Sequence, residues 1–163
     1  MNDAEILFER RGDIGVVILN RPKALNALTL TMVREMTPQM QSWATDPEVK
    51  AVVVRSAGDR GFCAGGDIRA LYESGRDKTP YASAFWAEEY RLNTLIKEFP
   101  KPYVALVQSI VMGGGVGLSV HGTYRVACET TTFAMPESGI GLFPDVGGTY
   151  FLPRLPGRSG LYL

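Results

Sequence analysis

The sequence has no excess of either charge and no long apolar run. Its 17 basic and 17 acidic residues give a formal net charge of +0 at pH 7, so no broad field attracts a nucleic-acid backbone or an anionic membrane. No apolar run approaches the roughly 20 residues that a membrane-spanning helix needs. These absences argue against a nucleic-acid-binding or membrane protein, and any charged ligand must therefore be held by local contacts.

The start of the chain and the cysteines also lack familiar signals. Residues Met1 to Arg11 carry too many charges for the apolar centre of a secretory signal peptide, which predicts a cytoplasmic protein. The two cysteines, Cys63 and Cys128, lie far apart in the sequence and have neither metal-ligand nor redox spacing. We expect both to be reduced and buried as small fillers of the core.

Motifs for nucleotide binding and for a serine-based triad are missing as well. The glycine run from Gly113 to Gly117 lacks the lysine of a phosphate-binding loop and does not complete a dinucleotide fingerprint. His121 is the single histidine, and Ser119, two positions earlier, would not face it on a helix. We therefore expect no cofactor and no metal ion, and we interpret His121 as a structural residue at a helix end.

The sequence does contain short β-branched runs that alternate with helical segments. Strands are predicted at five places: Gly15–Asn20, Ala51–Arg55, Tyr103–Val107, Tyr124–Ala127 and Thr132–Ala134. Helices are predicted over Thr29–Ala44, where Pro38 needs a kink or an exposed turn, over Tyr81–Phe99, and from the glycine run onward. No linker, low-complexity segment or charge run divides the chain, so residues 1–163 are predicted to form a single α/β domain.

Two glycine-rich turns suit the stabilisation of an oxyanion. The first, Gly113-Gly114-Gly115, lets a ligand approach the peptide N–H groups closely, and a helix that starts there directs its free N–H groups and positive dipole end at the ligand. The second turn, Ala64-Gly65-Gly66-Asp67, follows a predicted strand and can direct another N–H at the same point. Asp67 is expected to fix that turn by hydrogen bonds to the backbone.

Four segments carry a resemblance to a known family: NRPKALNAL, GFCAGGDI, KPYVALVQSIVMGGGVGLSVHG and FAMPESGIGLFPDVGGTYFLPRL. They resemble the crotonase (enoyl-CoA hydratase/isomerase) superfamily and, within it, the 3-hydroxyisobutyryl-CoA hydrolase branch. The match runs from about Ile6 to the last residue with nearly ungapped spacing. The resemblance implies a crotonase-like core, a superhelix of repeated ββα units, that binds an acyl-CoA as substrate. It also implies Gly66 and Gly114 as the two oxyanion donors.

Glu137 is the main candidate for the chemistry. On its residues alone, the segment with Pro136 and Gly139 predicts a loop, in which Glu137 either serves a ligand or is a surface acid. By resemblance, it occupies the position of a catalytic glutamate of the hydratases, whose second glutamate is replaced here by Gly117. Because the addition of water to a double bond needs two groups, this loss favours thioester hydrolysis, in which Glu137 attacks the carbonyl or activates water.

Two further acids are candidates for substrate binding. Asp145 matches an acid of the hydrolase branch and is expected to accept a hydrogen bond from a substrate hydroxyl, which would favour 3-hydroxyacyl groups. It is alternatively the cap of a helix that begins near Val146, and both roles are compatible. Glu89 matches a substrate-site acid of the same branch and is otherwise a solvated helix charge.

The resemblance also implies where CoA lies. Contacts with CoA are expected from the turn after NRP and from the CAGGD turn, at Lys23, Ala24, Leu25, Ala64 and Gly66. Lys23 is a candidate for a CoA phosphate, although an exposed lysine beside a turn is usually only solvated.

Superfamily members continue well beyond this chain, with helices that cover the core and often build an oligomer. The segment from Gly157 to Leu163 looks like the first turn of a helix. We therefore expect the N-terminal portion of a longer protein that lacks the C-terminal helices of the fold, with a homo-oligomer possible at full length. The predicted activity is hydrolysis of a short branched 3-hydroxyacyl-CoA, as in valine catabolism. The alternatives are an enoyl-CoA hydratase or isomerase and a CoA-binding fragment without turnover.

Overall fold

Two β-sheets that share no strand organise the chain, and the computed structural model describes residues 4–161. The larger sheet has the strand order β1-β2-β3-β5-β7 and the smaller one the order β4-β6-β8. Strands β1 and β2 form an antiparallel hairpin, and every other pair is parallel. The strands are β1 (Ile6–Arg11), β2 (Ile14–Leu19), β3 (Ala51–Ser56), β4 (Gly61–Cys63), β5 (Tyr103–Leu106), β6 (Ile110–Met112), β7 (Tyr124–Val126) and β8 (Thr132–Ala134).

The helices follow pairs of strands. Three times the chain runs through one strand of the larger sheet and one of the smaller sheet, and then becomes helical. This repeat is the ββα unit of the prediction. The helices are α1 (Leu30–Thr45), α2 (Ile68–Asp77), α3 (Tyr81–Lys97), α4 (Gly114–Val120) and α5 (Gly148–Phe151), with 3-10 turns η1 (Pro22–Ala24), η2 (Pro136–Ile140), η3 (Leu152–Arg154) and η4 (Ser159–Leu161).

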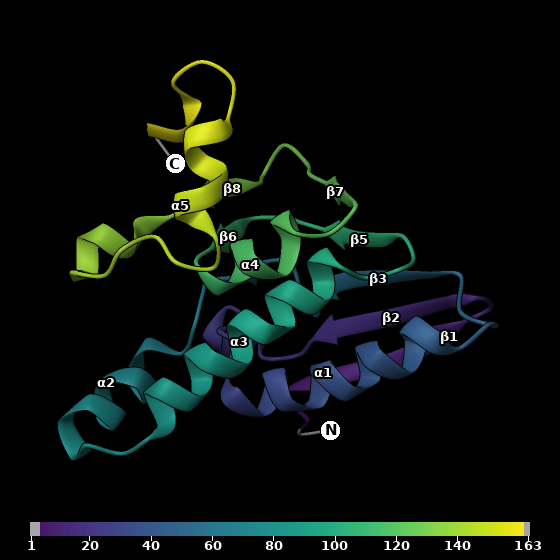
Figure 1. Cartoon of the computed structure of the whole chain (residues 1–163), viewed down its shortest axis with the longest axis horizontal. Helices are drawn as coiled ribbons and strands as arrows, with labels where there is room; N and C mark the ends of the chain where they lie inside the picture. Colours follow the sequence, from purple (N-terminus) through teal and green to yellow (C-terminus); the bar gives the residue numbers. More distant parts are fainter. Residues whose placement is uncertain (1–3, 162–163) are drawn as a thin grey trace.

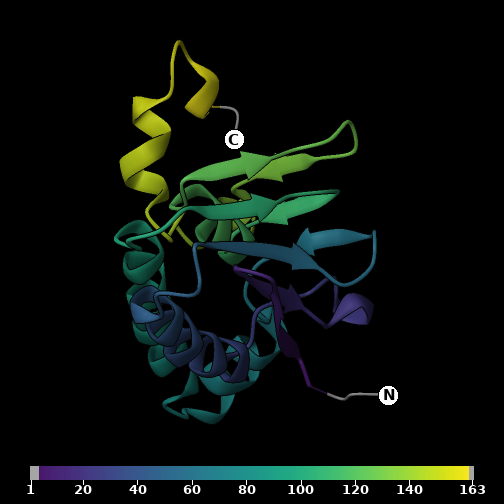
Figure 2. The same cartoon turned by 90° about the vertical axis from the view of Figure 1, so that its right-hand side faces the viewer.

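The two long helices cover the larger sheet. Helices α1 and α3 pack together along one side of it (Figure 2). Helix α1 begins where the Thr29 side chain accepts a hydrogen bond of 3.1 Å from the Met32 N–H, which satisfies one free donor of the first turn. Pro38 lies inside the helix, as the sequence required, on its exposed face. There the missing N–H leaves a carbonyl that water can reach.

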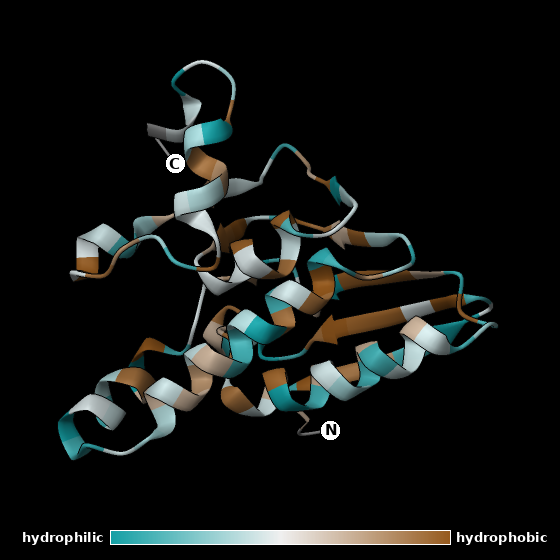
Figure 3. Cartoon of the chain, in the orientation of Figure 1, coloured by the Kyte–Doolittle hydropathy of each residue, from teal (hydrophilic) through white to brown (hydrophobic). Residues whose placement is uncertain are grey.

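A single hydrophobic cluster connects the layers. Its buried members come from both sheets and from α1, α3 and α4. Strands β2 and β3 are mostly hydrophobic along their length, whereas α1 and α3 alternate hydrophobic and hydrophilic residues (Figure 3). This pattern is typical of a parallel sheet whose central strands are buried and of helices with one face in solvent. The stable layers hold the glycine turns that follow β4 and β6.

Several local predictions need correction. Strands β1, β4 and β6 and helix α2 were not predicted, and Cys128 is exposed rather than buried, because its segment between β7 and β8 lies at the surface. Of the terminal segments, Met1–Asp3 and Tyr162–Leu163 lie outside the described residues, and the predicted helix start at Gly157 is the 3-10 turn η4. Helix α5 and the segment after it stand away from α1 and α2 (Figure 1).

The part of the chain from residue 4 to residue 161 contains no helix with the length and apolar character needed to cross a bilayer. The same part contains no group of three or more acidic, histidine or cysteine side chains arranged to hold a metal ion.

Candidate active site

Two glycine turns lie side by side where the parallel strands β4 and β6 end. A Cβ on Gly114 would stand only 3.4 Å from the amide nitrogen of Gly66. The Gly66 N–H is left unused by the neighbouring bridge, whose hydrogen bonds run from Leu28 N to Gly65 O and from Asp67 N to Leu28 O. Gly114 is the first residue of α4, so its N–H has no acceptor within the helix. Two backbone donors thus lie next to each other without side chains between them.

Asp67 stabilises one of these turns in the predicted manner and in one further way. Its Oδ1 accepts from the Ala70 N–H at 3.3 Å, which caps α2, and its Oδ2 accepts from the Arg21 guanidinium at 2.9 Å. The ion pair connects the Gly65-Gly66 turn to the segment before η1. Asp67 therefore fixes the turn from outside the pocket.

Glu137 lies at the first of the two glycine turns. It is on the 3-10 turn η2, where a loop was predicted, and the residue is only 6% exposed. A Cβ on Gly113 would stand 2.9 Å from Glu137 Oε1, so the carboxyl group packs directly on the glycine backbone. Its Oε2 has no hydrogen-bond partner among the described residues. Glu137 is therefore a buried acid that faces the donors and not a surface acid.

Asp145 enters the same pocket from the segment before α5. It is 8% exposed, and its Oδ2 accepts a hydrogen bond of 2.8 Å from the Tyr90 hydroxyl. The alternative role of a helix cap does not hold, because α5 begins after Gly147 without a side-chain cap, and the Gly148 N–H donates to the backbone oxygen of Asp145. Tyr90 was missed in the sequence, where its only signal is its position next to Glu89.

Glu89 reaches the pocket from the middle of α3. It is 2% exposed, and its Oε1 would stand 2.6 Å from a Cβ on Gly114. The same oxygen has no hydrogen-bond partner among residues 4–161. The solvated acid of this pair is its neighbour Glu88, which forms a bidentate ion pair with Arg34 at the surface. The interpretation of Glu89 as a solvated helix charge is therefore wrong.

The three carboxyl groups influence one another. Burial raises the pKa of Glu89 to about 8, and the negative charges of Asp145 and Glu137 add to the effect. Burial and the charge of Asp145 also raise the pKa of Glu137. Burial raises the pKa of Asp145, while the hydrogen bond from Tyr90 opposes that shift. At neutral pH the site therefore favours a protonated Glu89 beside two more acidic groups.

These groups line one cavity of about 190 Å³. Six of the predicted site residues line it: Ala64, Gly66, Glu89, Gly114, Glu137 and Asp145. Its apolar wall was not predicted and includes Ile68, Leu71, Phe85, Trp86, Ile140 and Leu142. No lysine or arginine is among the lining residues. An uncharged, partly apolar acyl group suits such a cavity, whereas an anion does not.

The remaining predicted contacts lie outside this cavity. Lys23, Ala24 and Leu25 form or end the turn η1, where Lys23 and Ala24 are exposed. The Ala64 N–H donates a hydrogen bond of 3.0 Å to the Leu25 carbonyl, so η1 borders the second glycine turn. These residues therefore lie beside the cavity and do not line it.

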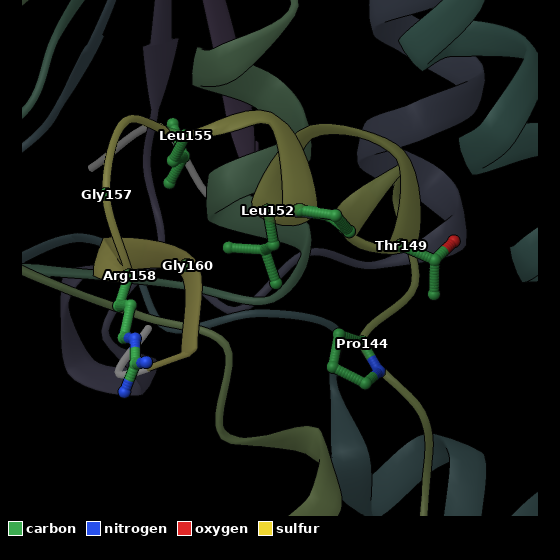
Figure 4. Close-up of a pocket in the computed structure, with 9 residues that line it drawn as sticks. Pro144, Thr149, Leu152, Leu155, Gly157, Arg158 and Gly160 are labelled. Carbon is green, nitrogen blue, oxygen red and sulfur yellow. The ribbon is translucent and has the colours of Figure 1, made fainter.

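A larger hollow of about 470 Å³ lies near the C-terminal segment (Figure 4). Leu152, Leu155, Pro144 and Arg158 are among its lining residues, and no carboxylate is. Among the described residues it has neither the paired backbone donors nor an acid, so the smaller cavity is the better candidate for chemistry.

Comparison with known proteins decides the family. Residues 14–163 match the family model described as enoyl-CoA hydratase/isomerase. The chain belongs to this family. It is 59% identical over 160 residues to the 3-hydroxyisobutyryl-CoA hydrolase, mitochondrial, of Danio rerio, covering 98% of this chain and 42% of that protein. It is 56% identical over 159 residues to the protein of the same name from Homo sapiens, covering 98% of this chain and 41% of that protein.

Solved structures agree on the fold. A carnitinyl-CoA dehydratase from Mycobacterium thermoresistibile superposes with a TM-score of 0.95 at 50% identity, over 98% of this chain and 47% of that one. An enoyl-CoA hydratase from Rhodobacter sphaeroides 2.4.1 gives 0.94 at 47% identity, over 98% and 48%. The predicted crotonase-like α/β fold is confirmed, and the chain spans less than half the length of these family members.

The predicted cytoplasmic location is contradicted. The relatives from Danio rerio, Xenopus tropicalis and Homo sapiens are all named as mitochondrial proteins. The prediction rested on charge balance and on the lack of a secretory signal, and neither property distinguishes one aqueous compartment from another.

Proposed function

We propose that the chain belongs to an acyl-CoA thioester hydrolase that acts on short branched 3-hydroxyacyl-CoA of the 3-hydroxyisobutyryl-CoA type, a thioester of valine breakdown. The products are the free hydroxy acid and CoA. The relatives at 59% and 56% identity support this assignment by their names, although the chain spans less than half of each.

The observation that carries the proposal is the position of Glu137. Its buried carboxyl group packs on Gly113, the residue before Gly114, and Gly114 in turn lies beside the Gly66 nitrogen. A thioester oxygen placed between the two N–H groups would bring its carbonyl carbon within reach of this one carboxylate. Backbone donors in this position stabilise the negative charge that develops on the oxygen when a nucleophile adds.

Glu137 has two possible roles in this geometry. As a nucleophile, it forms a C–O bond to the carbonyl carbon while the C–S bond breaks, which gives a mixed anhydride and a CoA thiolate that takes up a proton; water then cleaves the anhydride and restores the carboxylate. As a general base, it takes a proton from a water molecule that attacks the same carbon. In both roles Gly66 and Gly114 hold the oxyanion.

Asp145 and the apolar wall explain the choice of substrate in this proposal. The Asp145 carboxylate, held by Tyr90, accepts a hydrogen bond from the 3-hydroxyl group. Glu89, protonated at neutral pH because burial raises its pKa to about 8, is a second polar contact near the acyl group. Phe85 and Trp86 enclose the branched carbon chain. CoA extends from the cavity past Ala64 towards the exposed turn of Lys23, Ala24 and Leu25.

A second candidate function, hydration of an enoyl-CoA, is favoured by the names of the two solved neighbours at 50% and 47% identity. Hydration needs a second group to share the proton transfers. The superfamily places a glutamate for this purpose at the position of Gly117, which has no side chain. Thioester hydrolysis needs only one carboxylate, so we propose hydrolysis rather than hydration.

The test uses the full-length protein with two assays. Release of the CoA thiol is measured with 3-hydroxyisobutyryl-CoA, and loss of the conjugated double bond is measured with crotonyl-CoA. We expect thiol release that is strongly lowered by Glu137→Gln and retained by Glu88→Gln, a matched change of a surface glutamate paired with Arg34. Hydration without thiol release would replace the proposal by the second candidate. Binding of acyl-CoA without either reaction would leave a CoA-binding protein without turnover.

A further inference from the structure

Gly117 on α4 faces two side chains that leave it no room for a Cβ. A Cβ at this position would stand 2.5 Å from Asn93 Oδ1 on α3 and 2.9 and 3.0 Å from Cβ and Cγ1 of Val146. Cβ contacts under 3.0 Å are essentially never seen in proteins, so even alanine would force a neighbour to move. Asn93 and Val146 therefore occupy the space that a side chain at position 117 would need.

Val146 adopts an unusual backbone conformation. Its φ is 41°, in the left-handed region that β-branched residues rarely adopt. The side chain is nevertheless buried against Gly117 as part of the hydrophobic cluster. A residue keeps such a strained conformation only when the surrounding structure holds it there. The contact of the Val146 side chain with α4 is one of the contacts that hold it.

A second contact fixes the backbone of the same turn. His121, at the end of α4, donates a hydrogen bond of 2.7 Å from Nε2 to the Val146 carbonyl, since a carbonyl can only accept. Burial lowers the pKa of His121, which favours its neutral form. Gly147, the next residue, also has a positive φ of 85° and packs on the His121 ring. The turn is thus attached to α4 through both the side chain and the carbonyl of Val146.

The residue immediately before this turn is Asp145. The left-handed backbone at Val146 allows the valine side chain to enter the core while the Asp145 carboxylate points into the cavity and meets the Tyr90 hydroxyl at 2.8 Å. We propose that Gly117 is a positioning residue for Asp145. Because Gly117 has no side chain, Val146 can pack against α4. The packed Val146 turn then holds the Asp145 carboxylate in place. Gly117 thereby sets the preference for a 3-hydroxyl group without touching the substrate.

The other contacts indicate which neighbour would move if position 117 gained a side chain. Asn93 is buried, and its Nδ2 donates to the Glu89 carbonyl at 2.8 Å, which restrains the amide, although its Oδ1 has no hydrogen-bond partner among the described residues. The Val146 turn belongs to an irregular segment between η2 and α5. The Val146 turn should therefore yield and carry Asp145 with it.

The substrate part of this proposal rests on the proposed hydrolase function, so the experiment has two independent readouts. In the full-length protein, kcat and KM are measured for CoA release from 3-hydroxyisobutyryl-CoA and from isobutyryl-CoA, which lacks the hydroxyl group. A crystal structure of each variant then reports the separation of Tyr90 Oη and Asp145 Oδ2. Gly75→Ala is the matched control, because Gly75 lies in helix α2 with open space around its Cα.

Gly117→Ala should lower kcat/KM for the hydroxy substrate about tenfold more than for isobutyryl-CoA, and should break the Tyr90–Asp145 hydrogen bond. The double variant Gly117→Ala with Val146→Gly should recover only part of this ratio, because it removes the collision with Val146 but also the valine side chain that holds the turn. Glycine tolerates the left-handed turn, and removal of the valine side chain gives both the new methyl group at position 117 and the Asn93 amide room. Gly75→Ala should change neither the ratio nor the hydrogen bond.

Val146→Ala provides a second variant if Gly117→Ala does not fold. This variant keeps Gly117 but shortens the side chain that packs against it, so the turn is held less firmly. We expect a smaller loss of kcat/KM, confined to the hydroxy substrate. Equal losses on both substrates, or an intact Tyr90–Asp145 hydrogen bond in Gly117→Ala, would overturn the proposal. Absence of thiol release from the wild-type protein would refute the hydrolase function alone, because the crystallographic readout would still decide the role of Gly117.

Discussion

The Tyr90 hydroxyl donates a hydrogen bond of 2.8 Å to Oδ2 of Asp145 and joins helix α3 to the segment before α5. The bond stabilises the charged form of Asp145 against the burial that raises its pKa. It also occupies one of the two carboxylate oxygens of Asp145, a residue that lines the cavity. Burial and the charge of Asp145 raise the pKa of Tyr90, so the phenol stays protonated and remains a donor.

Tyr90→Phe should therefore weaken recognition of the hydroxyl group. Loss of a hydrogen bond to a charged partner costs about 1.5–3 kcal/mol, so kcat/KM for 3-hydroxyisobutyryl-CoA should fall on the order of tenfold or more, with a smaller loss for isobutyryl-CoA. CoA release on both substrates is the measurement. Tyr72→Phe, on an exposed face of α2, is the control and should behave as wild type; a loss for Tyr90→Phe that is the same on both substrates would contradict the assignment.

Glu137→Gln should remove the chemistry for every substrate. Because an amide neither attacks the carbonyl nor takes a proton from water, turnover should fall by roughly 10²- to 10⁴-fold with and without a 3-hydroxyl group. Acyl-CoA binding, measured by calorimetry, should survive. Turnover close to that of wild type would remove Glu137 from the reaction.

Asp145→Ala should separate recognition from chemistry. Loss of its hydrogen bond to the substrate should cost about 1–3 kcal/mol with a 3-hydroxyacyl thioester and much less with an acyl-CoA that lacks the hydroxyl group. The same thiol-release assay on the two substrates measures the difference. Should both activities fall equally, Asp145 would instead hold the loop or act in the chemistry.

Gly114→Val should disable the oxyanion donors. Any Cβ at this position would meet Glu89 Oε1 at 2.6 Å and crowd the Gly66 nitrogen at 3.4 Å. Turnover should fall on the order of 10²-fold or more, as it does when one oxyanion donor is lost. Circular dichroism must show intact folding, and a folded variant with unchanged turnover would exclude Gly114 from the site.

Glu89 should make folding stability depend on pH. Its pKa is raised from 4.5 to about 8 by burial, then by Asp145 and Glu137, so between these values the folded protein binds more protons than the unfolded chain. Stability should therefore fall as pH rises from about 4.5 to about 8. Thermal melts of the full-length protein across this range should show a weaker decline for Glu89→Gln than for wild type and for Glu88→Gln. Identical slopes in all three proteins would show that Glu89 does not titrate in this window.

The local pattern of hydrophobic and β-branched residues was sufficient to predict the longer helices and strands. The spacing of Leu30, Val33 and Met36 predicted α1, and the β-branched runs predicted β2 and β3 within one residue at each end. Strands β4 and β6 have three residues each and lead directly into the glycine turns, so they were missed, whereas β7 and β8, which are equally short, were predicted. The quoted motifs identified the family, and the resemblance supplied the six predicted residues that line the cavity, Glu89 on α3 among them. Residue types and their spacing along the chain can be compared without knowledge of the packing.

The sequence pattern did not show which acids are buried; the tertiary packing decided this. The pair Glu88 and Glu89 illustrates the reason. Consecutive residues on a helix point about 100° apart, so one of the two acids must turn away from the other, but the local sequence does not say which one meets α4. The glycine at position 114 lets α4 approach closely enough to bury Glu89, while Glu88 remains at the surface with Arg34. The sequence by itself determined which acids and glycines are present and in what order. Only the tertiary structure decided that Glu89, Glu137 and Asp145 share one cavity, because their proximity depends on contacts between distant segments, such as that of Tyr90 with Asp145, 55 residues further along the chain.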